Sequence, residues 1–101
     1  MSRLPDAHRR INAEIAQEKA ATLGRAGERL EAALEHVTSL GRRLDAAADP
    51  VERAGLLGEY ESARVRAIYA RLALVIQREA LGLRHHRIVD QQFPEPPRRT
   101  R

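Results

Sequence analysis

A seven-residue repeat of large aliphatic residues dominates the first half of this 101-residue chain. Leu23, Leu30, Val37 and Leu44 recur at this interval, with alanine and glycine between them. A heptad of apolar residues keeps one face of a helix turned toward a partner helix. The mixture of large and small side chains lets that partner approach closely. Residues 14–44 therefore predict a long helix that packs against another helix.

The composition predicts an all-α fold in a single domain. A chain of 101 residues fits one domain, and 43% of the residues are apolar but only 3% are aromatic. The core must therefore consist of Leu, Ile, Val and Ala. β-Branched residues are few and do not alternate with polar residues over the length of a strand, so we expect no sheet.

One short stretch divides the helical pattern into two helices. Asp49 can cap a following helix, Pro50 suits the first helical position, and Glu52 occupies the acidic position of a capping box. We therefore predict a first helix over about 7–47 and a second over about 50–87. Because the link between them is so short, the two helices should form an antiparallel hairpin.

The two ends of the chain are expected to lie outside the hairpin. Residues 1–6 should be loose, and the helical hairpin domain spans residues 1–92. Phe93-Pro94 should stop helix formation, because proline disfavours a helical residue before it. The sequence PEPPRRTR then contains three prolines and no large apolar residue. Such a composition predicts a disordered basic tail over residues 93–101.

A hairpin with its turn centred near Ala48 fixes which residues face each other. Leu30 then lies opposite Ala67, and Leu23 lies opposite Leu74. Large side chains thus mostly meet small ones, as in helices that interdigitate.

The second helix carries another apolar stripe, away from this seam, that a two-helix hairpin leaves uncovered. A helix that is apolar around much of its circumference must be buried on several sides. We predict that a second copy covers the stripe, giving a homodimeric four-helix bundle; another partner protein is the alternative. The predicted dimer interface consists of Val65, Ile68, Leu72, Val75 and Ile76.

The same register brings polar residues together at the open end of the hairpin. Inter-helix ion pairs that fix the register are the simplest interpretation. A binding pocket for an anion or small ligand is a second, and a carboxylate metal site is a third, although the Glu-x-x-His spacing of bundle metal sites is absent. The candidate ligand-binding residues are Glu14, Glu18, Arg78, Glu79, Arg84 and His86.

The net charge of +4 comes from the second half of the chain, which raises the question of nucleic acid binding. Arg64, Arg71 and Arg78 repeat every seven residues beside the seam. They could contact phosphates, but this placement also suits arginines that flank a helical interface. There is no helix-turn-helix pattern, and aromatic residues are too few for base stacking. A basic nucleic-acid-associated protein is therefore the alternative hypothesis and not the leading one.

Several other classes are disfavoured by what the sequence lacks. There is no cysteine, no apolar run of the ~18 residues that a membrane span needs, and no signal peptide pattern. We expect a cytoplasmic protein that does not bind membranes. No nucleophile–base arrangement or phosphate-binding loop is present, so neither catalysis nor a cofactor is predicted. The leading hypothesis is a self-associating structural or protein-interaction module; a carrier of a small ligand or metal, using the open-end cluster, is a further alternative.

Two runs of the sequence stand out, EIAQEKAATLGRAGERLEAAL at residues 14–34 and IQREALGLRHHR at residues 76–87. They resemble a family of small, uncharacterised all-helical proteins of proteobacteria. The resemblance rests on Glu14-Ile15-Ala16, Glu18-Lys19-Ala20, Leu23 to Gly27, Gln77 to Ala80, Gly82 to Arg84, and His86. It implies a bacterial helical protein and no known activity.

Overall fold

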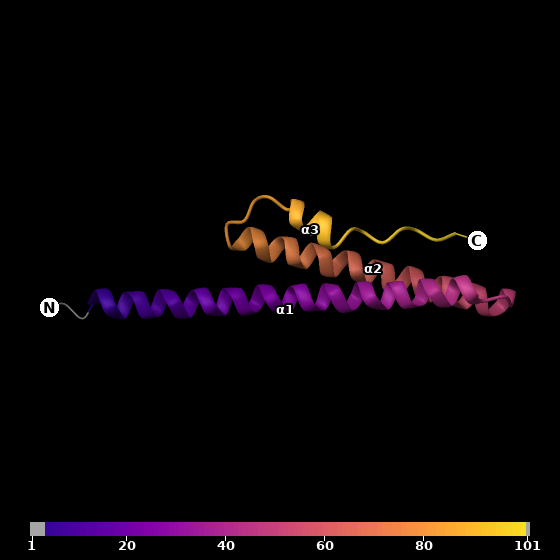
Figure 1. Ribbon diagram of the computed structural model, residues 1–101, viewed down its shortest axis with the longest axis horizontal. Coiled ribbons are helices and arrows are strands. Elements are labelled where there is room, and N and C mark those ends of the chain that lie inside the picture. The colour runs from indigo at the N-terminus through magenta and orange to yellow at the C-terminus, as the bar shows by residue number, and fades with distance from the viewer. Residues whose placement is uncertain (1–3, 101) are drawn as a thin grey trace.

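Three helices make up the regular structure of the protein. A computed structural model describes residues 4–100, with α1 at Leu4–Ala46, α2 at Pro50–Ala80 and α3 at Arg87–Gln92. The helices α1 and α2 pack against each other in opposite directions, and the molecule as a whole is a rod with extents of 76 × 20 × 15 Å (Figure 1). The predicted all-α class and the pairing of two long helices are confirmed. None of the helices in this part of the chain is long and apolar enough to cross a lipid bilayer.

The ends of the helices differ from the predicted ones. Helix α1 already begins at Leu4, within the segment expected to be loose; residues 1–3 lie outside the described part. Helix α2 ends at Ala80 and not near residue 87. The cause is local: Gly82 has a φ of 86°, and the N–H of Leu83 donates to the carbonyl of Arg78 over 3.0 Å. This is the hydrogen bond of a glycine-terminated helix.

Two glycines should respond in opposite ways to replacement by alanine. Gly82→Ala puts a Cβ into a left-handed conformation and should destabilise the protein by about 1–2 kcal/mol. Gly24→Ala, in the middle of α1, meets no atom within 4 Å and should stabilise it by about 1 kcal/mol, because alanine is the better helix former. Urea denaturation of both variants measures the signs, and a destabilising Gly24→Ala would contradict this account.

The turn between α1 and α2 has the capping structure that the sequence predicts. The Asp49 carboxylate accepts a hydrogen bond of 2.9 Å from the N–H of Glu52, and Pro50 occupies the first turn. Arg53 then donates to the carbonyl of Leu44 over 3.0 Å, which ties the start of α2 to the end of α1. These hydrogen bonds therefore fix the short link at the end of α1 and at the start of α2.

Loss of this cap should have a measurable effect. We expect Asp49→Ala to lower the free energy of unfolding by about 1 kcal/mol, because one N–H of the first turn loses its acceptor. Asp49→Asn keeps a capping oxygen and should be close to the wild type. Chemical denaturation followed by circular dichroism compares the two, and equal losses would show that the carboxylate charge matters more than the hydrogen bond.

The heptad residues of α1 form the core along the seam. Near the turn, a first cluster contains Val37, Leu40, Leu44, Leu56, Tyr60, Ala63 and Ala67. Farther from the turn, a second cluster contains Ala26, Leu30, Leu74 and Val89, with Leu23 and Ala70 packed against it. Leu23 and Leu74, which the predicted register pairs, both belong to the second cluster or pack against it, whereas Leu30 lies in the second cluster and its predicted partner Ala67 in the first. Val89 belongs to α3, so the second cluster is completed by a third helix.

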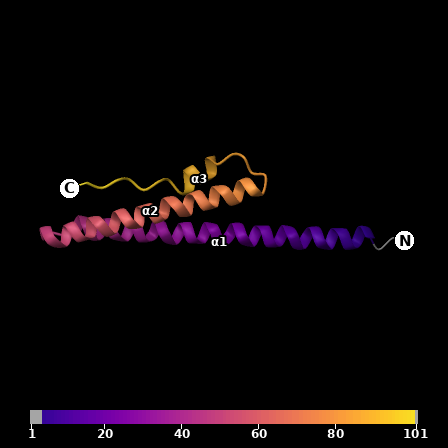
Figure 2. The ribbon, with the colours of Figure 1, turned by 180° about the vertical axis from the view of Figure 1, so that it is seen from behind.

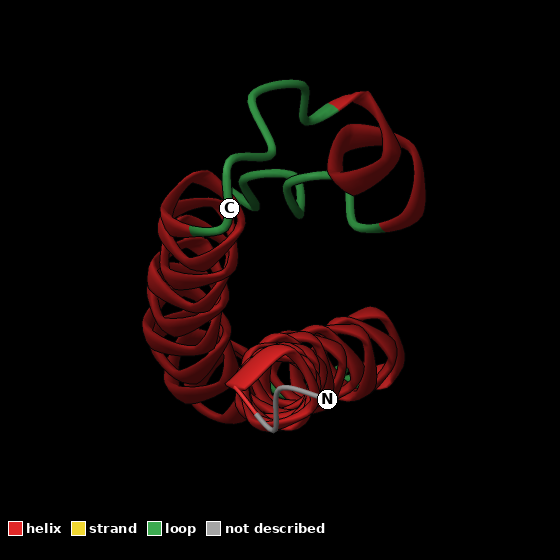
Figure 3. Ribbon diagram, turned by 90° about the vertical axis from the view of Figure 1, so that its left-hand side faces the viewer, coloured by secondary structure: helices red, strands yellow, loops and turns green. Residues whose placement is uncertain are grey.

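The chain after α2 folds back along the hairpin toward the turn. Figures 1 and 2 show α3 and the following residues running beside α2, and in the view along the rod α1, α2 and α3 surround a common centre (Figure 3). Residues 93–100, called the C-terminal segment below, are extended and contact both long helices. This placement differs from the disordered tail that the composition predicts. Its backbone carbonyls accept hydrogen bonds from α2, and the Arg99 side chain pairs with Asp45 of α1.

The first part of α1 has no neighbouring helix. With 43 residues against 31, α1 is longer than α2 and extends beyond its end (Figure 1). Residues 5–20 are accordingly exposed, including Ile11 at 53% and Ile15 at 42%.

Candidate functional site

The structure divides the predicted open-end cluster into two parts. Arg78, Glu79 and His86 lie together at the end of α2. Arg78 donates to the carbonyl of His85 over 3.0 Å and lies 3.4 Å from His86 Nδ1, while His86 Nε2 lies 3.2 Å from Glu79 Oε1. These contacts hold the loop of residues 81–86 against α2, which is a structural role.

The other candidates of that cluster do not take part in these contacts. Glu14 and Glu18 lie on the exposed first part of α1, and Arg84 is an exposed residue of the loop. Because α2 ends at Ala80, no helix continues beside the start of α1 to carry partners for them. Within residues 4–100, no three His, Asp or Glu side chains gather so that they could hold a metal ion.

The heptad row of arginines on α2 has a role that the sequence left open. Each of the three donates to a backbone carbonyl of the returning chain: Arg78 to His85, Arg71 to Phe93 over 3.1 Å, and Arg64 to Pro96 over 3.0 Å. The three guanidinium groups thus form a row on one face of α2, called the arginine ladder below, and bind carbonyls of the chain that follows α2.

Two arginines of this ladder, Arg64 and Arg71, also form ion pairs. Arg64 is only 7% exposed and also pairs with Glu61 at 3.1 Å, and Arg71 pairs with Asp90 of α3. Both are therefore committed to the fold and are not free to contact phosphates.

Two further side chains complete a groove that receives the C-terminal segment. The Tyr60 hydroxyl donates to the carbonyl of Pro97 over 2.6 Å. Arg99 pairs with Asp45 of α1, and its guanidinium carbon lies 5.6 Å from the centre of the Tyr60 ring, within the range of a cation–π contact. We call this surface the C-terminal groove; it consists of Asp45, Tyr60, Arg64 and Arg71.

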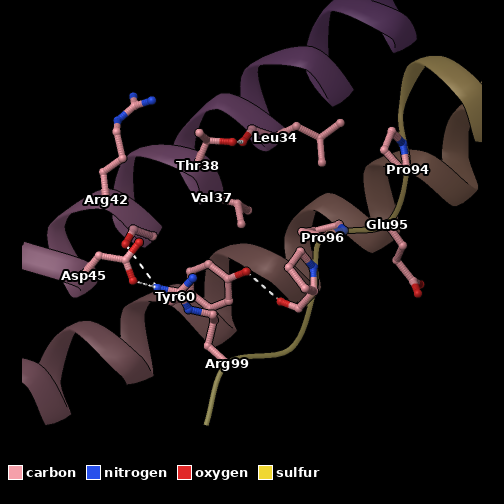
Figure 4. Close-up of a pocket in the computed structure, with 12 residues that line it drawn as sticks. Leu34, Val37, Thr38, Arg42, Asp45, Tyr60, Pro94, Glu95, Pro96 and Arg99 are labelled. Carbon is pink, nitrogen blue, oxygen red and sulfur yellow. Dashed lines mark hydrogen bonds and ion pairs between the residues drawn. The ribbon is translucent and has the colours of Figure 1, made fainter. Parts of the chain in front are cut away.

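A cleft of about 480 Å³ lies between the C-terminal segment and α1. Leu34, Val37 and Thr38 of α1 line one side, and Pro94 and Pro96 line the other (Figure 4). Arg42 and Asp45 add charged groups to its α1 side. The segment therefore does not fill the space available to it.

The outward face of α2 carries the apolar residues that the hairpin leaves in solvent. Leu72 is 51% exposed, Ile76 is 55% exposed and Val65 is 39% exposed. Tyr69, which the sequence analysis did not include, is 67% exposed on the same face. We call these four residues the outer stripe; their spacing of four, three and four residues places them on one helix face.

The remaining residues of the predicted interface lie differently. Val75 is half-buried and packs against the second core cluster, and Ile68 is also half-buried. The cluster that partly covers Val75 includes Val89 of α3. Val65 and Leu72 are seven residues apart, and so are Tyr69 and Ile76. Tyr69 could therefore have been recognised from the sequence as part of the second row of the same heptad repeat.

Sequence reasoning did not find the C-terminal groove. Two signals pointed to it: the heptad row of arginines beside the seam, and a proline-rich segment that is rich in acceptors and poor in donors. Neither signal states which carbonyl each arginine binds.

No protein-family model matches the chain, and comparisons with characterised proteins and with solved structures also gave no match. The resemblance of residues 14–34 and 76–87 to a proteobacterial family therefore stays a prediction.

Proposed function

We propose that the protein is a self-associating helical interaction module that forms a homodimer through the outer stripe of α2. The observation that carries this proposal is the exposure of Val65, Tyr69, Leu72 and Ile76 on a face that neither α1 nor the returning chain covers. A contiguous exposed apolar patch on a chain of this size marks an interaction site.

Charge complementarity favours a second copy in parallel orientation as the occupant. The outer stripe places Tyr69 and Ile76 at one core position of a heptad, and Val65 and Leu72 at the other. Parallel pairing then brings Glu61 of one copy next to Arg66 of the other, on both sides of the interface. An antiparallel pairing centred on the stripe instead brings Glu61 close to Glu79 of the other copy, where like charges repel.

The resulting assembly has the α1–α2 hairpins of two copies joined through α2, so that four long helices lie side by side. Helix α1 lies on the opposite side of α2 from the stripe and does not obstruct the contact. The dimer would present two exposed α1 ends and two C-terminal grooves to other molecules.

Nucleic acid binding has less support. Arg64, Arg71 and Arg78 form the arginine ladder, which leaves Arg66, Arg84 and Arg87 as the exposed arginines of that region. These three do not form a row that follows a phosphate backbone.

Sedimentation equilibrium of the wild-type protein tests the proposal. We expect a mass of two chains in the low micromolar range. A protein that stays monomeric at high micromolar concentration, while circular dichroism shows full helicity, would overturn the proposal.

A further inference from the structure

The C-terminal segment is held mainly through its backbone. Tyr60, Arg64 and Arg71 donate to the carbonyls of Pro97, Pro96 and Phe93. Among the side chains of the segment, Pro94, Glu95 and Pro97 are exposed, and Phe93, Pro96 and Arg99 are half-buried. The groove therefore recognises an extended chain with free carbonyls more than it recognises these particular side chains.

A proline-rich chain is the ligand that fits such a row of donors. Proline has no N–H and favours the extended polyproline conformation, so its carbonyls are available and little conformational entropy is lost on binding. Grooves that recognise such chains combine an aromatic side chain with hydrogen-bond donors. Tyr60 supplies the ring and a hydroxyl donor, and two guanidinium groups extend the row of donors.

One end of the groove also selects a positive charge. Asp45 and the carbonyl of Gly41 lie at hydrogen-bonding distance from the Arg99 guanidinium, which also stacks near the Tyr60 ring. A ligand should thus carry an arginine two residues after the proline whose carbonyl Tyr60 binds, as Arg99 follows Pro97.

The segment leaves room for a larger ligand. The cleft of about 480 Å³ between it and α1 is lined by Leu34, Val37 and Tyr60, which are apolar or aromatic. A proline-rich peptide with a larger apolar side chain in place of Pro94 would fill space that Pro94 leaves empty (Figure 4).

We propose that the C-terminal groove is a binding surface for an extended, proline-rich, arginine-containing peptide of another protein, and that the C-terminal segment is its intramolecular occupant. The occupant is tethered through the loop of residues 81–86 and α3 and so competes at a high effective concentration. Weakening the contacts between the C-terminal segment and the groove therefore makes the groove accessible to a peptide in solution.

The test uses a fluorescently labelled peptide with the sequence of residues 93–100, FPEPPRRT, titrated into the full-length protein. Arg99→Ala in the protein removes an ion pair and a cation–π contact from the tethered segment and leaves the groove unchanged. We expect this variant to bind the peptide roughly fivefold to tenfold more tightly than the wild type. The reason is that the tethered segment, which competes with the peptide, loses a partly exposed ion pair and a cation–π contact.

The controls separate recognition from charge attraction and from unfolding. The peptide FPEPPRAT lacks the arginine that corresponds to Arg99, which pairs with Asp45 and lies over the Tyr60 ring. Because this control changes the peptide and leaves the tethered segment the same, it should bind to the Arg99→Ala variant more weakly than FPEPPRRT. The peptide FAEAARRT has the same charges without prolines and should bind more weakly to the same protein. Circular dichroism must show equal helicity in all variants.

Two results would overturn the proposal. Equal binding of the two peptides would show that only charge is recognised. An absence of peptide binding to a folded Arg99→Ala variant at millimolar concentration would show that the groove holds its own segment and nothing else. Neither result bears on dimerisation, which the outer stripe and not this groove would mediate.

Discussion

Leu30→Asp is expected to unfold the protein at room temperature. Leu30 is 0% exposed and lies in the cluster with Ala26, Leu74 and Val89, where α1, α2 and α3 meet. An isolated carboxylate in such a site has no hydrogen-bond partner, and the cost of burying it is several kcal/mol. The lost packing adds about 2–5 kcal/mol, while the total stability of a small domain is about 5–15 kcal/mol. Loss of the helical circular dichroism signal is the measurement.

A matched control separates burial from helix propensity. Ala32 lies two residues away on the same helix and is exposed. Ala32→Asp makes a comparable change in charge and should cost less than about 1 kcal/mol, the difference in helix propensity. Equal melting temperatures for wild type and Leu30→Asp would show that Leu30 is not in the core and would contradict the observed register.

The hairpin could be predicted because its determinants lie in the local sequence. The heptad of Leu23, Leu30, Val37 and Leu44 places one apolar face on a helix, and a face of this kind requires a partner. Asp49 specifies the turn through a single hydrogen bond to a residue three positions later. Together they fix the pairing without any knowledge of distant contacts.

The returning chain could not be predicted by the same reasoning. Its anchors join residues far apart in the sequence, such as Arg71 with Phe93 and Tyr60 with Pro97. Composition suggested disorder because residues 94–100 contain no large apolar side chain to bury. Composition describes only the side chains, whereas this segment is held mainly through backbone carbonyl groups, which every residue has.

The open-end cluster shows how one local error changes a predicted site. The register placed Glu14 and Glu18 near the end of the second helix, which was expected to continue to about residue 87. Gly82 ends α2 earlier and turns the chain back toward the hairpin. Arg78 and Glu79 therefore bind the loop that follows them. Arg78 and Glu79 are on the predicted helix, but Arg84 and His86 lie in the loop of residues 81–86. Glu14 and Glu18 lie on the exposed first part of α1.

The double substitution Leu72→Glu/Ile76→Glu should convert the proposed dimer into a monomer. Both side chains are exposed in the single chain, at 51% and 55%, so the hairpin itself should keep its helicity. Burying a Leu or Ile contributes roughly 1.5–3 kcal/mol, and a symmetric dimer loses two of each. The added glutamates also repel each other across the interface. We expect the dissociation constant, measured by sedimentation equilibrium, to rise at least about a thousandfold, or ~4 kcal/mol.

The matched control is Ile11→Glu/Ile15→Glu in the first part of α1. These two isoleucines are similarly exposed, at 53% and 42%, but they lie outside the outer stripe. This variant should remain a dimer, because the proposed interface does not use this site. Its substitutions remove a similar amount of exposed apolar surface, which makes it a control for the α2 variant. If the α1 variant dissociates and the α2 variant does not, the subunits associate through the exposed end of α1, and the outer stripe must have another partner. Dissociation of both would mean that apolar surface anywhere on the rod drives association, which is the behaviour of an aggregate and not of a specific dimer.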